Sequence, residues 1–220
     1  MIIIYIFLGL IYGYLVGTYL ESFIHDKIMH STFVHKFAFN RTKVSHEEIH
    51  HLKTFKTNHI TQFSSKQEEK ELDIFLNNKY HSDFARWVKK ENYGMTLTNY
   101  SLLLHNLPFL PIIIITYLYS NYIFFYCSLI PIIFVSIMSK YFHSYFHCSF
   151  NEAMNTAPFL TRIILDTPIM RRVWRLHYVH HKQKKFNFNL LLGGDWLRGV
   201  LKEPNKEQLD DMKKLGLPMN

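Results

Sequence analysis

The chain has 220 residues, of which 48% are hydrophobic, including 19 Phe and 14 Tyr. This length supports a single domain. The net charge of +8 would suit nucleic acid, but the basic residues flank long apolar stretches, where we expect them to face lipid headgroups. Because Cys127 falls within an apolar run and Cys148 is the other cysteine, composition argues against a disulfide framework.

Charged residues are segregated along the chain. No Lys, Arg, Asp or Glu occurs in residues 1–20 or 92–139, and all 25 Lys and Arg lie between Lys27 and Lys90 or between Lys140 and Lys214. A soluble protein distributes charges along its exposed positions, whereas a membrane-spanning helix needs about 20 apolar residues. The uncharged stretches therefore predict an all-α integral membrane protein.

The first predicted span covers residues 1–22. It lacks the basic start and the small-residue cleavage site of a signal peptide, so we expect it to be a retained anchor. Further along, residues 66–90 contain the helix-forming runs EEKELDIFLNN and DFARWVKK. In the second run Phe84, Trp87 and Val88 make an amphipathic pattern, which suits either the bilayer surface or an ordinary helix on the soluble side.

Two more spans are predicted at residues 97–119 and 122–138. The uncharged Ser120–Asn121 turn joins them, and so short a link predicts an antiparallel hairpin. Three prolines within them are expected to kink the helices, which a membrane tolerates when neighbours satisfy the freed carbonyls. These prolines are Pro108, Pro111 and Pro131.

The order of the spans sets the topology. Three spans place residues 23–96 and 139–220 on the same side of the membrane, together with every Lys and Arg. The positive-inside rule makes that side cytosolic, so we expect one domain, residues 1–220, in which three spans carry a cytosolic helical cap. The apolar residues 157–165 could lie in the interface.

Histidines form four short clusters on the predicted cytosolic side. Random placement would not gather ten of the fourteen histidines in such windows. The clusters are His25-DKIM-His30, His46-EEI-His50-His51, His143-SYF-His147 and His177-YV-His180-His181.

Helical geometry gives the clustering a chemical meaning. At roughly 100° per residue, histidines four apart lie on one helix face and can direct two imidazoles at one point. The spacing predicts such pairs for His143 and His147 and for His177 and His181, and again for His46 and His50. His25 and His30 would lie about 140° apart on an ideal helix, so that pair must straddle the site or the helix must distort.

Other uses of histidine fit this pattern less well. A single histidine at a membrane boundary is usually an interfacial residue, and a pH-sensing patch does not need repeated HxxHH spacing. A membrane b-type cytochrome would use at most two histidines per haem, and a zinc transporter or store usually has acidic ligands within its spans. Ten imidazoles suit two six-coordinate ions with open positions, which favours iron although zinc binds the same ligands.

The order HxxxxH, HxxxHH, HxxxH, HxxHH resembles the fatty acid hydroxylase/sterol desaturase superfamily of membrane di-iron enzymes. The resemblance covers His25 to about Gly199. The closing region is particularly similar to bacterial fatty acid hydroxylases, through the run from Arg171 to His181, then Asn187-Phe188-Asn189 and Gly194-Asp195-Trp196-Leu197.

The resemblance implies an O₂-dependent monooxygenase that hydroxylates or desaturates a lipid, foremost a fatty acyl chain, with carotenoid or sterol hydroxylation as the alternative. It implies two iron ions, with zinc possible in the purified protein, and an external electron donor such as a reductase, a cytochrome or a ferredoxin. The membrane would be the cytoplasmic membrane of a bacterium or the endoplasmic reticulum of a eukaryote. The implied ligands are His25, His30, His46, His50, His51, His143, His147, His177, His180 and His181.

Beyond these ligands the sequence names no catalytic residue. Carboxylates beside the clusters could accept the outer imidazole N–H, and the candidates are Asp26, Glu47, Glu152 and Asp195. The chain also departs from the superfamily pattern, because three residues precede the paired histidines of the second cluster and because residues 55–90 have no evident counterpart. His105 lies within a span and could form the site wall, a proton route or a bond to a neighbouring helix. The remaining histidines, His35, His59 and His81, fall outside the pattern.

Overall fold

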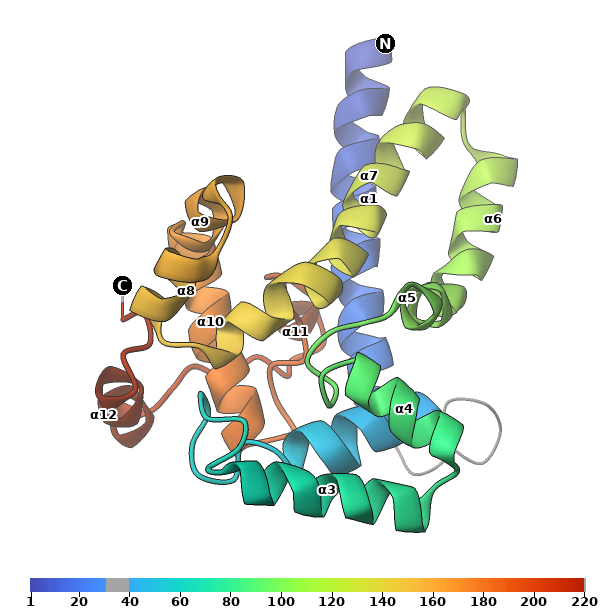
Figure 1. Ribbon diagram of the computed structural model, residues 1–220. Helices are drawn as coiled ribbons and strands as arrows, with labels where there is room; N and C mark the ends of the chain where they lie inside the picture. The colour runs from blue at the N-terminus through green and yellow to red at the C-terminus, as the bar shows by residue number, and fades with distance from the viewer. Residues whose placement is uncertain (31–39, 220) are drawn as a thin grey trace.

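The computed structural model describes residues 1–30 and 40–219, and these are helical with no β-strand. Three helices among them are long and apolar enough to cross a membrane, namely Ile2–Met29, Asn99–Tyr119 and Tyr122–His147. Figure 1 shows the N-terminus and the turn between α6 and α7 at one end of these helices, and most of the shorter helices at the other. These candidate helices agree in number and approximate place with the predicted spans, although the first continues beyond residue 22 to Met29 and the third beyond residue 138 to His147.

The first span packs closely against the third. Helix α1 (Ile2–Ile24) lies along α7 (Tyr122–Ile137), and Gly9, Gly13 and Gly17 of α1 face it at four-residue intervals. A Cβ atom at Gly13 would lie 2.1 Å from the carbonyl oxygen of Ser128. Glycines at this spacing let two helix backbones approach each other, which supplies packing energy where lipid offers no hydrophobic drive.

The second span bends at its prolines. Helix α5 (Asn99–Asn106) passes through the 3₁₀ turn η4 (Leu107–Phe109) into α6 (Leu110–Tyr119), and Figure 1 shows α5 end-on where α6 stands upright. The Asn121 side chain then caps α7 by accepting a hydrogen bond from the N–H of Phe124 at 2.9 Å. The predicted hairpin and its two-residue turn are therefore confirmed.

A small core lies beneath the spans, between α3 and α4. It includes Leu72 and Leu76 of α3, Phe84 and Val88 of α4, and Ile49. The apolar face of α4 thus packs within the protein, which favours the interpretation as an ordinary helix over the bilayer-surface one. The elements are α2 (Asn40–Lys43), η3 (Val44–His51), α3 (Lys66–Lys79) and α4 (Ser82–Lys90).

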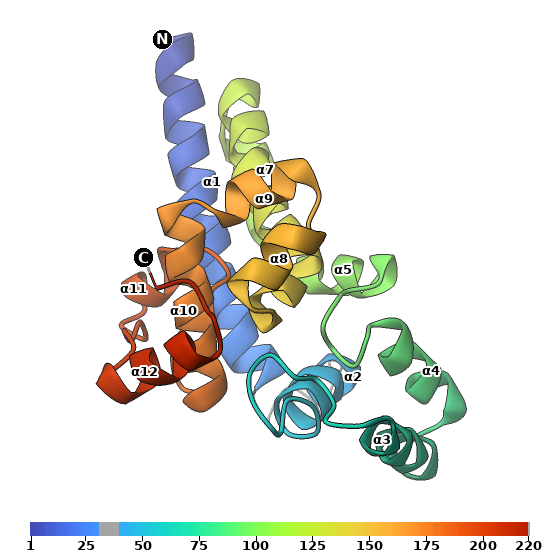
Figure 2. The same cartoon turned by 60° about the vertical axis from the view of Figure 1, so that its left-hand side comes forward.

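The C-terminal helices pack around the buried ring of Trp174. The central one is α10, which Thr167 caps through a hydrogen bond from the N–H of Met170 at 3.3 Å. In Figures 1 and 2 helix α9 rises above α10 toward the level of the spans, and its Phe159, Leu160 and Ile163 are exposed. The helices are α8 (Phe150–Thr156), α9 (Phe159–Leu165), α10 (Pro168–Lys182), α11 (Gly194–Leu197) and α12 (Lys206–Lys214).

Candidate metal centre

The structure brings all ten cluster histidines together and divides them into two groups of five. Within each group, one nitrogen of every imidazole lies within 4.8 Å of the others, so each group could hold a metal ion. Site A consists of His25, His30, His46, His51 and His180, and site B consists of His50, His143, His147, His177 and His181.

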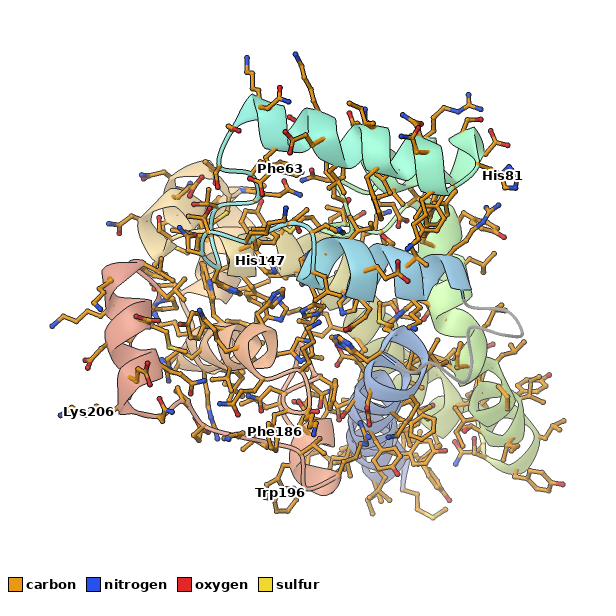
Figure 3. All side chains as sticks on the ribbon, turned by 90° about the horizontal axis from the view of Figure 1, so that it is seen from below. Phe63, His81, His147, Phe186, Trp196 and Lys206 are labelled. Carbon is orange, nitrogen blue, oxygen red and sulfur yellow. The ribbon has the colours of Figure 1, made fainter. Side chains whose placement is uncertain are left out.

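The two sites adjoin each other. The rings of His51 in site A and His181 in site B are stacked with centroids 4.2 Å apart, and His46 and His50 are 5.5 Å apart across the same boundary. Figure 3, which views the molecule from below, shows His147 between the segment around η3 and helix α10. Four segments that are distant in sequence therefore converge at one end of α1 and α7.

Two of the four clusters lie on π-helices rather than α-helices. Residues 25–29 form η1 and Val44–His51 form η3. Because a π-helix bonds residue i to i+5, residues five apart share a face, which places His25 beside His30 and His46 beside His51. The expected pairing of His46 with His50 is therefore wrong, since these two residues belong to different sites.

The other two clusters supply mostly site B. Helix α10 is α-helical, so His177 and His181 share a face and both join site B, while His180 points to site A. His143 and His147 also share site B as expected, although they lie on the 3₁₀ turn η6 (His143–His147). The predicted convergence of these two pairs is confirmed, and only the type of helix differs at the third cluster.

The outer nitrogens of several imidazoles are fixed by hydrogen bonds. Backbone carbonyls accept from Nδ1 of His25 (Phe188, 2.6 Å), His143 (Met95, 3.1 Å), His147 (His59, 2.9 Å) and His180 (Phe186, 2.8 Å). A carbonyl oxygen can only accept, so each of these Nδ1 atoms carries the proton. In a neutral ring the Nε2 atom then carries a lone pair, which is the form that binds a metal.

The contacts within site A cannot all be hydrogen bonds between neutral rings. His25 Nε2 lies 2.8 Å from His46 Nε2, and His180 Nε2 lies 3.2 Å from His51 Nε2. Since Nε2 of His25 and of His180 can only accept, His46 and His51 must both donate. Yet Nε2 of His46 and of His51 also face each other at 3.1 Å, where two N–H groups would collide. A cation among the four nitrogens removes this conflict, so the residues fit a bound metal.

Burial keeps these imidazoles in the neutral form that a metal requires. Burial, reinforced by the neighbouring imidazoles, holds the pKa of His50 and of His51 well below the usual value. The same causes depress the pKa of His177 and of His181, and the pKa of His180 falls to about 3. Neutral rings at physiological pH present lone pairs without competition from protons.

The four carboxylates proposed to support the ligands have different environments. Glu47 accepts a hydrogen bond from Nδ1 of His30 and one from Lys184 Nζ at 2.8 Å, and these two partners hold the pKa of Glu47 down at about 2 despite its partial burial. Asp26 pairs with Arg198 at 2.5 Å and with Lys27 at 3.0 Å. Glu152 is exposed at the start of α8.

The fourth carboxylate, Asp195, joins α11 to α1. It is buried and accepts hydrogen bonds from Ser22 Oγ at 2.6 Å and from the N–H of Asn189 at 2.8 Å. Asn189 in turn donates to a carboxylate oxygen of Glu21 at 2.8 Å. The Asn187–Asn189 and Gly194–Leu197 runs thus hold the segment whose Phe188 carbonyl orients His25, and their contribution to the site is positional. Glu21, the buried partner on α1, was missed by the sequence reasoning.

His59, which the cluster pattern left out, lies against site B. It is buried, its carbonyl accepts the Nδ1–H bond of His147, and its own Nε2 donates to the carbonyl of Phe146 at 2.8 Å. Phe55 from the same segment stacks on His147 with ring centroids 4.2 Å apart. The signal available in the sequence was the FKTNH run soon after the second cluster, in the region without a counterpart in the superfamily.

Of the remaining histidines, His105 is buried and lines a cavity beside site A, which fits the site-wall alternative, and its Nε2 has no hydrogen-bond partner among the described residues. His81 is exposed at the start of α4, and Figure 3 labels it away from His147. His35 lies outside the described residues.

A cavity adjoins both sites. Its lining includes His25 and His46 of site A and His143 of site B, together with apolar side chains such as Leu97 and Leu190. A ligand in this cavity would therefore lie beside both groups of imidazoles.

No family model, curated protein or solved structure matches this chain. The superfamily resemblance therefore rests on the histidine spacing and the closing sequence runs, and the metal centre rests on the geometry described above.

Proposed function

We propose that this protein is a membrane-bound, non-haem oxygenase that holds two iron ions and hydroxylates or desaturates an unactivated C–H bond of a lipid, foremost a fatty acyl chain. The observation that carries the proposal is the division of ten histidines, seven buried and three partly buried, into two adjoining groups of five beside a partly apolar cavity. The superfamily resemblance in sequence points to the same chemistry.

The ligand set favours redox chemistry over storage. Five imidazoles leave an octahedral ion one open position, and imidazole suits iron, zinc, copper and nickel alike. Iron with an open position supplies O₂ activation, which the inert C–H bond of a lipid requires. A haem uses two axial ligands, so the membrane b-type cytochrome does not account for two five-histidine groups.

The chain's own residues would prepare the site in three ways. The carbonyls of Phe188, Met95 and Phe186 hold three imidazoles in the tautomer that turns Nε2 inward. Glu47 orients the ring of His30, because its carboxylate accepts a hydrogen bond from the outer N–H of that ring. Burial of most of the imidazoles would limit the access of bulk water to ions held there.

We place the metal centre on the cytosolic face. This placement is supported by the position of the histidines at the C-terminal ends of α1 and α7 and by the concentration of Lys and Arg in the segments that follow the spans. The lipid would reach the cavity from the bilayer between the spans, and a soluble reductase, cytochrome or ferredoxin would deliver electrons from the cytosol.

Metal analysis tests the site. The protein purified in detergent is expected to hold about two metal ions per chain, and His147→Ala and His180→Ala should each lower that content while the exposed His81→Ala leaves it unchanged. Unchanged metal content in both cluster variants would refute the assignment.

Product analysis tests the reaction. Incubation with lipid extract, a reductant and ¹⁸O₂ is expected to give a lipid with one labelled oxygen, or a product lighter by two hydrogens if the enzyme desaturates. The lipid that changes distinguishes an acyl chain from a carotenoid or a sterol. A protein with two metals and no oxygen-dependent product would instead be a metal-binding protein.

A further inference from the structure

Helix α9 exposes large apolar side chains on the side that faces away from the protein. Its Leu165 is buried in the core around Trp174. On the outer side, Phe159, Leu160 and Ile163 are 67%, 71% and 53% exposed. At roughly 100° per residue these three side chains fall within an arc of about 100°, opposite Leu165. A helix that faces water has polar residues on its outer face, so α9 departs from that pattern.

Two helices farther from the spans, α3 and α12, follow the usual pattern. The exposed positions of α12 are all charged, and those of α3 are Lys, Gln, Glu or Asn with the exception of Ile74. These outer faces suit contact with water. An exposed group of large apolar side chains instead marks a surface that meets an apolar partner, and the position of α9 in the fold indicates which partner that is.

Helix α10 sets the depth of α9 relative to the spans. Its His180 lies beside His25 at the C-terminal end of α1, with ring centroids 4.7 Å apart. From there α10 runs back alongside the spans, and Figures 1 and 2 both show α9 at its far end, at the height of α1 and α7 rather than of α3 and α12. The part of α10 between Pro168 and His180 is about 18 Å long. Interfacial helices bury their apolar faces about 5–10 Å deep, so α9 lies at a depth where lipid can cover it.

Helix α11 also lies beside a candidate span. A Cβ atom at Gly194 would lie 2.0 Å from the carbonyl oxygen of Thr18, and the hydroxyl of Tyr14 donates to the carbonyl of Leu192 at 2.6 Å. Tyr14 and Thr18 belong to the charge-free stretch of α1. In α11 itself, Trp196 is 70% exposed, and Figure 3 shows it at the edge of the molecule. Tryptophan is enriched where a protein meets the bilayer interface, so α11 suits the same surroundings as α9.

We propose that α9 and α11 enter the bilayer leaflet next to the metal centre and contact lipid through the exposed side chains described above. Arg162 of α9 is also exposed, and a long basic side chain can reach the headgroups while its neighbours stay among acyl chains. In sequence the two helices flank α10, which carries three of the ten histidines. The segment on both sides of these ligands is therefore attached to the membrane, whichever reaction the metal centre performs.

Nitroxide labels on the protein in vesicles of phosphatidylcholine and phosphatidylglycerol test this contact. The labels are attached to Leu160→Cys and to Trp196→Cys, each in a chain whose own cysteines are removed by Cys127→Ala and Cys148→Ala. Collisions of each label with oxygen, which concentrates in the bilayer, are compared with collisions with a water-soluble nickel chelate. Metal content and thermal unfolding show that each labelled chain is folded and loaded.

Two exposed positions supply the reference values, Leu8 on α1 for lipid and Ile74 on α3 for water. We expect the ratio of oxygen to nickel collisions at Leu160 and at Trp196 to be several-fold higher than at Ile74 and close to that at Leu8. A ratio like that of Ile74 at either position would overturn the proposal for that helix. A label at Leu160 that is shielded from both reagents, with spectral broadening that decreases when unlabelled chain is added, would also overturn it, because a second copy of the chain would then cover α9.

Discussion

The imidazole rings of His25 and His30 are stacked, with centroids 5.1 Å apart and planes inclined by 9°. On an α-helix the two residues would face directions about 140° apart. The π-helix η1 brings them onto one face because its hydrogen bonds join residues five apart. A spacing that is unsuitable for a shared site on an α-helix is therefore suitable here.

The same π-helical geometry predicts that two adjacent residues serve different metals. His50 belongs to site B and His51 to site A. We expect His50→Ala and His51→Ala each to lose about one of two metal ions, and the double variant to lose both. By contrast, His51→Ala combined with His180→Ala, both in site A, should retain one. Metal content by mass spectrometry separates the two double variants, and equal retention in both would contradict the division into two sites.

Glu47 and Glu48 offer a matched pair of carboxylates. Glu47 accepts the outer N–H of His30, whereas Glu48 binds Lys79 and Tyr80 at 2.8 Å each. Removing an outer partner of a ligand usually costs roughly 10- to 100-fold in metal affinity. We expect Glu47→Gln to weaken retention at site A by that order in a chelator competition, with site B unaffected. Glu48→Gln is the control, and a comparable loss there would show that general destabilisation is the cause.

The spans and the histidine set could be predicted because they depend on local sequence. Charge-free stretches and the positions of histidines are visible without the fold, and α10 follows ordinary α-helical spacing, so the pairing of His177 with His181 was predicted. The pairing of His46 with His50 could not be, since π-helical hydrogen bonding is set by tertiary packing. Gly94 illustrates this packing, because a Cβ there would lie 2.7 Å from the carbonyl oxygen of Ser45 within η3.

The supporting residues were hidden for a different reason. His147 is oriented by the main-chain carbonyl of His59. Every residue has such a carbonyl, so the residue type does not reveal which one accepts the hydrogen bond. The Gly9, Gly13 and Gly17 series, however, is a recognisable helix-packing motif that the hydropathy argument overlooked.

His59 is expected to matter for one site only. Its Nε2–H bond to the Phe146 carbonyl fixes the loop whose own carbonyl orients His147. We expect His59→Leu to lower metal affinity at site B by roughly tenfold and to leave site A intact, and His59→Gln, which keeps an N–H donor, to restore much of the loss. Spectra of the cobalt-substituted protein would show the change at one of two ions. A loss at site A of the same size would argue that the variant only loosens the fold.

The buried histidines also predict an acid-sensitive metal-free protein. Burial holds the pKa of His46 and of His50 well below the unfolded value of about 6.5, and it lowers the pKa of His180 to about 3. Below about pH 6.5 the unfolded chain binds protons that the folded chain does not, so the free energy of unfolding must fall as pH falls. This stability is fully present above pH 6.5 and decreases toward the folded pKa values.

Thermal unfolding of the metal-free protein between pH 7.5 and 5 measures this loss. We expect Tm to fall steeply as pH falls. His180→Gln should make this fall shallower, because unfolding then takes up about one proton fewer, whereas the exposed His81→Gln should leave the pH dependence unchanged. A Tm independent of pH across this range would mean that the imidazoles are protonated or solvent-exposed without metal.

The glycine contact between α1 and α7 sets how closely the two long helical segments that contain His25 and His143, Ile2–Met29 and Tyr122–His147, approach each other. A Cβ at Gly13 would lie 2.1 Å from the Ser128 carbonyl oxygen, a fixed backbone atom, whereas one at Gly17 would lie 3.2 Å from a methyl of Val135. Gly13→Ala must therefore separate the backbones and is expected to cost about 1–3 kcal/mol, with a lower Tm in detergent. Gly17→Ala should cost less, because the Val135 side chain can move. The separation would also move His25 away from His143. Gly13→Ala should therefore lose metal more readily than Gly17→Ala. The reverse order would mean that this contact does not hold the two halves of the metal centre together.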